Sequence, residues 1–96
     1  MVNSFIIHFN DDVVTVTKAI LKGETIKYVL IGREVEIEAT ENIPLYHKAA
    51  VKNVNKGSNL HKYGEVIGYA TRDIKIGEHV HTQNLSDLTV KEGSAT

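Results

Sequence analysis

A short pattern that recurs along this chain is the strongest constraint on its fold. An aliphatic residue is followed three positions later by glycine, and a second aliphatic residue follows after three more positions. The pattern occurs in residues 17–26, 51–60 and 71–80, and residues 40–49 carry a degenerate fourth copy. Each copy predicts a buried aliphatic anchor, a tight turn at a positive φ, and re-entry into a strand.

The spacing of these corners is uneven, which excludes a solenoid because a solenoid needs a fixed period. Short strands between repeated corners indicate a compact, folded-over, mostly β domain. Residues rich in β-branched and aromatic side chains predict strands over 5–9, 13–17, 25–31, 34–40, 47–51, 65–70 and 78–82.

Two of these strands form a predicted hairpin. Gly32-Arg33 is the expected two-residue loop between residues 25–31 and 34–40. In the second arm, valine, isoleucine and alanine alternate with three glutamates, which predicts one buried face and one face in water. No stretch sustains a helical period over three turns.

Length and composition limit the function classes. Ninety-six residues suit a single domain, with an expected core over residues 5–85 and a polar tail, 86–96, expected to fray. A net charge of −1 argues against nucleic acid and against a polybasic membrane contact. No stretch approaches the roughly 20 apolar residues that span a bilayer. The absence of cysteine excludes disulfides, zinc thiolates and thiol catalysis, and fits a cytoplasmic protein.

His79 and His81 are the first candidate site. Residues two apart on a strand project from the same side, with their backbone positions roughly 6.5–7 Å apart. The two imidazoles could therefore share one metal ion or one anionic ligand, although a metal would need a third ligand. The alternative is two solvated histidines on an edge strand.

His47 and Lys48 form a second polar pair, which follows a corner at Pro44. Neighbouring residues on a strand face opposite sides, so one of the two can enter a site while the other meets solvent or a carboxylate. An enclosed lysine has a lowered pKa and can act as a base. The alternative is that both are ordinary surface residues.

Gly64 and Gly68 lie four apart around a short predicted strand. They permit the close approach of a ligand or another chain, or they simply permit a bend. Arg72 could hold a substrate carboxylate, although an exposed pair with Asp73 explains it equally well. No serine lies in a recognisable nucleophile elbow.

Three segments together resemble a known family. They are residues 47–49 (HKA), 62–71 (KYGEVIGYAT) and 77–84 (GEHVHTQN), in that order and spacing. They look like the SAF domain of altronate and galactarate dehydratases, which also occurs as the small subunit of lyases such as sulfolactate sulfo-lyase. The resemblance covers residues 5–85 and implies a β-clip fold.

The resemblance implies removal of water, or of another small leaving group, from a sugar acid or related hydroxycarboxylate. It points to a divalent metal, iron or manganese, shared with a large dehydratase subunit, and it leaves a homo-oligomer open. The matched motifs suggest that His47, Lys48 and His81 are catalytic and that His79 and His81 bind metal. The residues expected to contact substrate are Tyr63, Gly64, Thr71 and Asn84.

Two positions depart from the family pattern. Gln83 replaces a further histidine, which weakens a three-histidine metal site, and Tyr46 replaces a glycine before the His-Lys pair. The motifs do not distinguish altronate, galactarate and sulfolactate as substrates. The alternative functions are a stand-alone module that binds carbohydrate or metal, and a structural adapter without catalysis.

Overall fold

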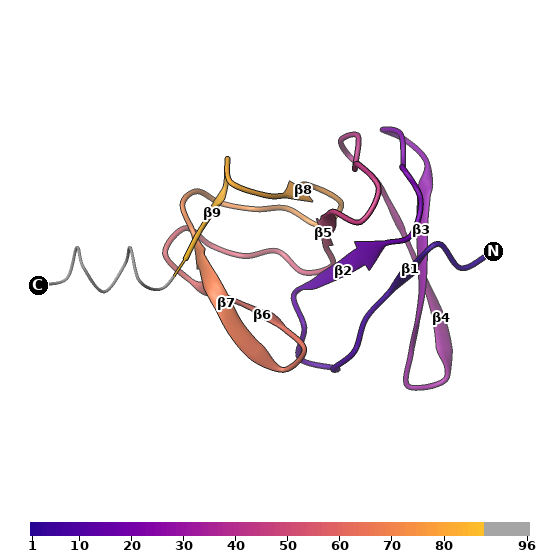
Figure 1. The fold of residues 1–96 in the computed structure, drawn as a ribbon, viewed down its shortest axis with the longest axis horizontal. Coiled ribbons are helices and arrows are strands. Elements are labelled where there is room, and N and C mark those ends of the chain that lie inside the picture. The colour runs from indigo at the N-terminus through magenta and orange to yellow at the C-terminus, as the bar shows by residue number, and fades with distance from the viewer. Residues whose placement is uncertain (88–96) are drawn as a thin grey trace, which may run out of the picture.

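The computed structural model describes residues 1–87, and their regular structure consists of β-strands without a helix (Figure 1). The strands are β1 (Ser4–Phe5), β2 (Val13–Val16), β3 (Thr25–Leu30), β4 (Arg33–Glu38), β5 (Lys48–Ala50), β6 (Asn59–Lys62), β7 (Glu65–Ala70), β8 (His79–Val80) and β9 (Leu85–Ser86). They form three antiparallel sheets, ordered β1-β2-β5-β8, β3-β4 and β6-β7-β9. The predicted mostly β class is confirmed. No helix within residues 1–87 has the length and apolarity needed to cross a membrane.

The four corners associate in two pairs. The anchors Ile20 and Ile43 form one isolated antiparallel bridge, and Val54 and Ile74 form the other. The predicted positive φ is present in every copy, at 91° for Gly23, 66° for Tyr46, 88° for Gly57 and 92° for Gly77. The same backbone bond also recurs: the amide at each of these four positions donates to the carbonyl of the residue directly before the paired copy, in the order Ala39, Val16, Ala70 and Ala50.

The central pair of strands, β2 and β5, separates two hydrophobic cores. Val14 and Ala49 pack into one core with the first two corners and the β3–β4 hairpin. Val13 and Ala50 pack into the other, with the last two corners and the β6–β7 hairpin. Because successive side chains of a strand alternate between faces, a strand between two cores is buried at every position. All four residues of β2 are buried for this reason.

Gly77 explains how the last corner reaches the first half of the chain. A Cβ at this position would collide with the carbonyl oxygen of Glu38, so the close approach requires glycine as well as the positive φ. The amide of Thr40 donates to the carbonyl of Gly77 at 2.9 Å. This contact places β8 beside residues 38–41.

Several predicted strand boundaries were wrong. Of the expected strand at 5–9, only Phe5 pairs with a neighbour, because the chain turns at Ile7 and leaves it 63% exposed. The hairpin loop is Ile31-Gly32, since φ is positive at both residues, as a type I′ turn requires.

Two strands were not predicted at all, and one is shorter than predicted. β6 occupies a segment expected to begin as a loop, and β9 pairs Ser86 with Tyr69. Of the predicted strand over 78–82, only residues 79–80 pair as β8. Residues 88–96 of the predicted tail lie outside the described residues.

Candidate active site

Three histidines gather where β5 meets β8. Lys48 pairs with Val80 and Ala49 pairs with His79, which brings His47 beside the end of β8. One nitrogen from each of His47, His79 and His81 lies within 4.8 Å of the other two. His47 Nδ1 is 2.8 Å from His79 Nε2. The His79 and His81 rings stack at 5.6 Å, as the predicted alternation requires.

His47 supplies the third candidate metal ligand that the sequence did not identify for His79 and His81. It is 32 residues from His79 in the chain, and its ring lies 4.6 Å from that of His81. The sequence assigned His47 a catalytic role apart from the metal-binding pair. Only the β5–β8 register brings the two motifs together.

Asn84 holds the turn that carries two of these histidines. Its side chain is fully buried; Oδ1 accepts the His81 amide at 3.0 Å and Nδ2 donates to the His79 carbonyl at 2.9 Å. Asn84 was predicted to contact substrate, but both polar atoms of its side chain are hydrogen-bonded to the backbone. Gln83 Nε2 donates to the same carbonyl at 3.0 Å, and the Glu41 carboxylate accepts the His79 amide at 2.8 Å.

The environment of His79 favours its neutral form, because its pKa is lowered. Burial lowers its pKa first, and the neighbouring His47, His81 and Lys48 lower it further against the opposing effect of Glu41. Neutral imidazole is the form that binds metal. Three clustered imidazoles suit iron or zinc better than manganese, which prefers oxygen ligands. The donor set therefore fits a divalent transition metal.

Lys48 lies beside this cluster, on the sheet face opposite His47. It lines a hollow of about 270 Å³ with Ile67, His81, Thr82, Leu85 and Asp87. Its half-buried side chain has no ion pair within residues 1–87. Burial lowers the pKa of Lys48, and Lys62 lowers it further. A partly buried cation without a counterion favours the binding of an anion, although the Asp87 carboxylate also lines this hollow.

Thr15 is a polar group near this hollow that the sequence did not predict. It pairs with Lys48 across β2 and β5, so the two side chains share a face of the sheet. Thr15 is 7% exposed, and its hydroxyl has no hydrogen-bond partner within residues 1–87. Its position in an apolar run, VVTV, predicts a strand and gives no functional signal.

Comparison with known proteins identifies the family. The model of the altronate/galactarate dehydratase SAF domain matches residues 2–88. The chain belongs to this family. The prediction made from the three motifs is confirmed.

Relatives of this SAF domain occur in two arrangements. Altronate dehydratase of Bacillus subtilis is 40% identical over 88% of the chain, and altronate dehydratase of Escherichia coli is 41% identical over 59%. The matches span only 17% and 13% of those two enzymes. The alpha subunit of (2R)-sulfolactate sulfo-lyase from Chromohalobacter salexigens is 31% identical over 84% of the chain, which spans 90% of that subunit.

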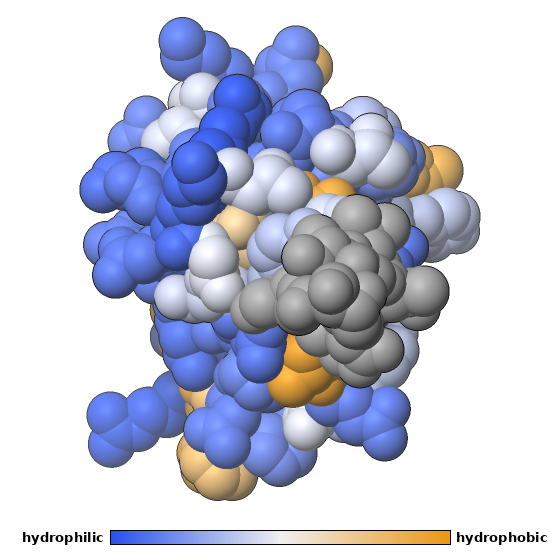
Figure 2. Space-filling view, turned by 90° about the vertical axis from the view of Figure 1, so that its left-hand side faces the viewer, coloured by the Kyte–Doolittle hydropathy of each residue, from blue (hydrophilic) through white to orange (hydrophobic). Residues whose placement is uncertain are grey.

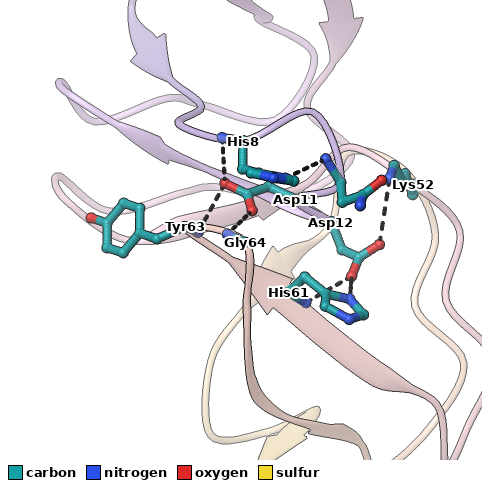
Figure 3. Close-up of polar contacts among 8 residues, drawn as sticks. His8, Asp11, Asp12, Lys52, His61, Tyr63 and Gly64 are labelled. Atoms are coloured by element: carbon teal, nitrogen blue, oxygen red, sulfur yellow. Dashed lines mark hydrogen bonds and ion pairs between the residues drawn. The ribbon is translucent and has the colours of Figure 1, made fainter.

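Tyr63 and Gly64 lie elsewhere in the SAF domain. They form the β6–β7 turn, with φ of 58° and 77°, at the opposite edge of the molecule from β8 (Figure 1). Their amides donate to the Asp11 carboxylate at 3.0 and 2.8 Å (Figure 3). Thr71 is exposed and donates its amide to the Asn84 carbonyl at 2.9 Å. The structure thus groups His47, Lys48, His79 and His81, with Asn84 behind them.

The Asp11 carboxylate joins the β6–β7 turn to the loop before β2. It is 1% exposed and also accepts the His8 amide at 3.1 Å. Burial by itself would raise the pKa of Asp11, but the amides of Gly64, Tyr63 and His8 outweigh it, so the pKa is lowered. The sequence predicted only a turn here, since these partners lie 52 and 53 residues away.

Asp12 makes the neighbouring contacts in Figure 3. Its Oδ2 accepts the His61 amide at 2.7 Å and lies 2.9 Å from His61 Nδ1. Lys52 Nζ lies 4.0 Å from the other carboxylate oxygen. The two aspartates therefore connect three segments that are distant in the chain.

Proposed function

We propose that this chain is the small subunit of a hydro-lyase that acts on a sugar acid or a related hydroxycarboxylate, and that turnover requires a larger chain. Two arrangements of the relatives support this: the domain is a small part of altronate dehydratase and nearly all of a lyase subunit called alpha. The substrates to consider are altronate, galactarate and sulfolactate.

The observation that carries the proposal is a cluster of imidazoles that shares His81 with a hollow containing Lys48. Elimination next to a carboxylate builds negative charge on that carboxylate as the α-proton leaves. Lys48 has no ion pair within residues 1–87, so we take it as the group that binds the carboxylate and stabilises this charge. Thr15 is a further candidate to bind a polar atom of the same substrate, because it pairs with Lys48 and its buried hydroxyl has no hydrogen-bond partner within residues 1–87.

His79 and His81 are the proposed metal ligands, and His47 completes the set because its Nδ1 lies 2.8 Å from His79 Nε2. A divalent metal, when bound, supplies a Lewis acid that polarises a substrate oxygen. His81 also lines the hollow, so it is placed to contact substrate directly. The larger chain would supply the remaining substrate contacts and exclude water.

A chimeric enzyme tests this function. The segment of Bacillus subtilis altronate dehydratase that matches this chain is replaced by residues 2–88, and the purified chimera is assayed with altronate, galactarate and sulfolactate. We expect elimination from at least one of them, and a loss of at least about 100-fold in kcat/KM in Lys48→Met, which keeps the side-chain length without the charge. An active Lys48→Met chimera removes Lys48 from the mechanism. A chimera inactive on all three acids contradicts the proposed function.

A second function, metal binding by the isolated domain, is favoured by one observation. All three donors of the histidine cluster come from this chain. Calorimetry with Fe²⁺ under anaerobic conditions separates the two functions: a submillimolar Kd for the isolated chain supports a binding module, whereas binding seen only in the chimera indicates ligands shared with the larger chain.

A further inference from the structure

Tyr46 occupies a corner position that three equivalent corners give to glycine. The φ of Gly23, Gly57 and Gly77 is 91°, 88° and 92°, and that of Tyr46 is 66°. The Tyr46 amide donates to the Val16 carbonyl at 3.0 Å, in the place of the Gly23 bond to Ala39. The fold therefore requires only a left-handed backbone conformation at position 46, which glycine adopts most easily.

The Tyr46 side chain contributes little to the domain itself. It is 70% exposed, and its ring makes no hydrogen bond and no aromatic contact within residues 1–87. Leu45, its neighbour, is 47% exposed. A bulky residue in a disfavoured backbone conformation occurs both here and at Ile31 in the β3–β4 turn, so the location of Tyr46 must show whether it has a function outside the domain.

The position of this pair next to His47 suggests which surface it serves. His47 follows Tyr46 directly and lies in the histidine cluster, so the backbone of Leu45 and Tyr46 leads directly into the candidate active site. By contrast, the face at the C-terminal side is mainly hydrophilic where its described residues are visible, with hydrophobic residues only in small separate areas (Figure 2).

We propose that Leu45 and Tyr46 are a docking contact for the larger dehydratase chain at the edge of the active site, an inference that rests on the proposed function. A second copy of this chain is a weaker candidate. A stable dimer needs about 800 Å² from each partner, whereas a fully buried tyrosine supplies roughly 150–250 Å². A large chain that also covers the hollow provides the missing area, and the SAF segment accounts for only 17% of such a chain in the Bacillus relative.

Hydroxyl-radical footprinting tests the contact, because it reports the exposure of individual side chains. The isolated chain is compared with the Bacillus chimera described above. We expect oxidation of Tyr46 to fall at least fivefold in the chimera. Ile31 is the matched control, since it is 81% exposed, has a φ of 49° and lies in the β3–β4 turn. Equal oxidation of Tyr46 in both proteins would overturn the inference, even if the chimera is fully active.

Variants separate the ring from the strained backbone. Tyr46→Gly relieves the left-handed strain and should leave the Tm of the isolated chain unchanged or higher, yet it should lower kcat/KM of the chimera about tenfold or more. Tyr46→Phe should retain activity, and Ile31→Gly should leave it unchanged. If Tyr46→Gly is as active as the parent chimera, the ring has no docking role. If the parent chimera is inactive, the proposed function fails, and footprinting still decides whether Tyr46 is covered.

Discussion

The two polar clusters of this domain differ in how completely their atoms are paired. Around Asp11, one buried carboxylate accepts hydrogen bonds from backbone amides of its own loop and of the β6–β7 turn. Both of its oxygens are hydrogen-bonded. Around Lys48, a half-buried ammonium and a buried Thr15 hydroxyl share a sheet face, and neither has a hydrogen-bond or ion-pair partner within the described part of the chain. Buried polar groups that serve stability are satisfied, whereas unsatisfied ones call for another partner, such as an ordered water, an ion or a ligand.

The histidine cluster extends this contrast. Three imidazoles lie together, and burial, followed by the neighbouring His47, His81 and Lys48, lowers the pKa of His79. Such an arrangement does little for stability, because none of the three imidazoles is paired with a carboxylate side chain within residues 1–87. We therefore expect substitutions in the histidine cluster to weaken metal binding with little loss of stability. We expect substitutions around Asp11 to lower stability with little effect on metal binding.

The largest effect is expected from His81→Ala on metal binding. Removal of one of three ligands should weaken Fe²⁺ binding by more than about 100-fold, because loss of an outer-shell partner alone costs 10–100-fold. The Tm should change little, since His81 is exposed. Anaerobic calorimetry and thermal unfolding measure the two effects. His61→Ala, which removes a histidine outside the cluster, is the control; equal metal affinity in both variants would contradict the assigned site.

Asp11→Ala should have the opposite profile. It leaves amides of His8, Tyr63 and Gly64 without an acceptor, and should lower the free energy of unfolding by about 2–4 kcal/mol. Metal affinity of the folded fraction should stay within twofold. Urea denaturation gives the stability, and Glu34→Ala, an exposed carboxylate, should stay within about 0.5 kcal/mol. A loss below about 1 kcal/mol for Asp11→Ala would show that the carboxylate does not hold the two loops together.

Asn84→Asp is expected to have an intermediate effect on metal binding. The aspartate keeps an acceptor for the His81 amide but loses the donor to the His79 carbonyl. A misplaced His79 should weaken Fe²⁺ binding about tenfold. Gln83→Glu is the matched change, because it removes the other amide donor to the same carbonyl from an exposed side chain. We expect a smaller loss there, and a larger one would assign the positioning role to Gln83.

The smallest effect is expected from Thr15→Val, which replaces an unpaired buried hydroxyl by a methyl group. The free energy of unfolding should rise or stay within about 1 kcal/mol, because no hydrogen bond within residues 1–87 is lost. In the chimera, KM for the accepted acid should rise severalfold. Thr17→Val, at an exposed position of the same chain segment, should leave KM unchanged. A Thr15→Val variant that is less stable, with an unchanged KM, would make the hydroxyl a structural group.

Local sequence patterns predicted much of the framework. The glycine spacing placed the corners at Gly23, Gly57 and Gly77, because a residue with a strongly positive φ rarely carries a side chain. Alternation in residues 34–39 gave the correct buried face of β4, since the period of a strand is two. The short strands β6 and β9 were missed because a strand of two to four residues is too short to show a clear alternation of polar and apolar residues. They are recognised as strands only by their pairing with β7.

The candidate site was only half visible in the sequence. Because the period of a strand is two, the sequence alone determined that the side chains of His79 and His81 project from the same face. It also determined that the side chains of the neighbours His47 and Lys48 project from opposite faces. That His47 joins the other two histidines, and that Thr15 lies across from Lys48, depended on the pairing of β2, β5 and β8. The hydrogen bonds from Tyr63 and Gly64 to the Asp11 carboxylate likewise join residues 52 and 53 positions apart in the chain. Local patterns encode turns and faces because those depend on near neighbours, whereas the meeting of distant side chains is decided by strand register and by which corners pack together.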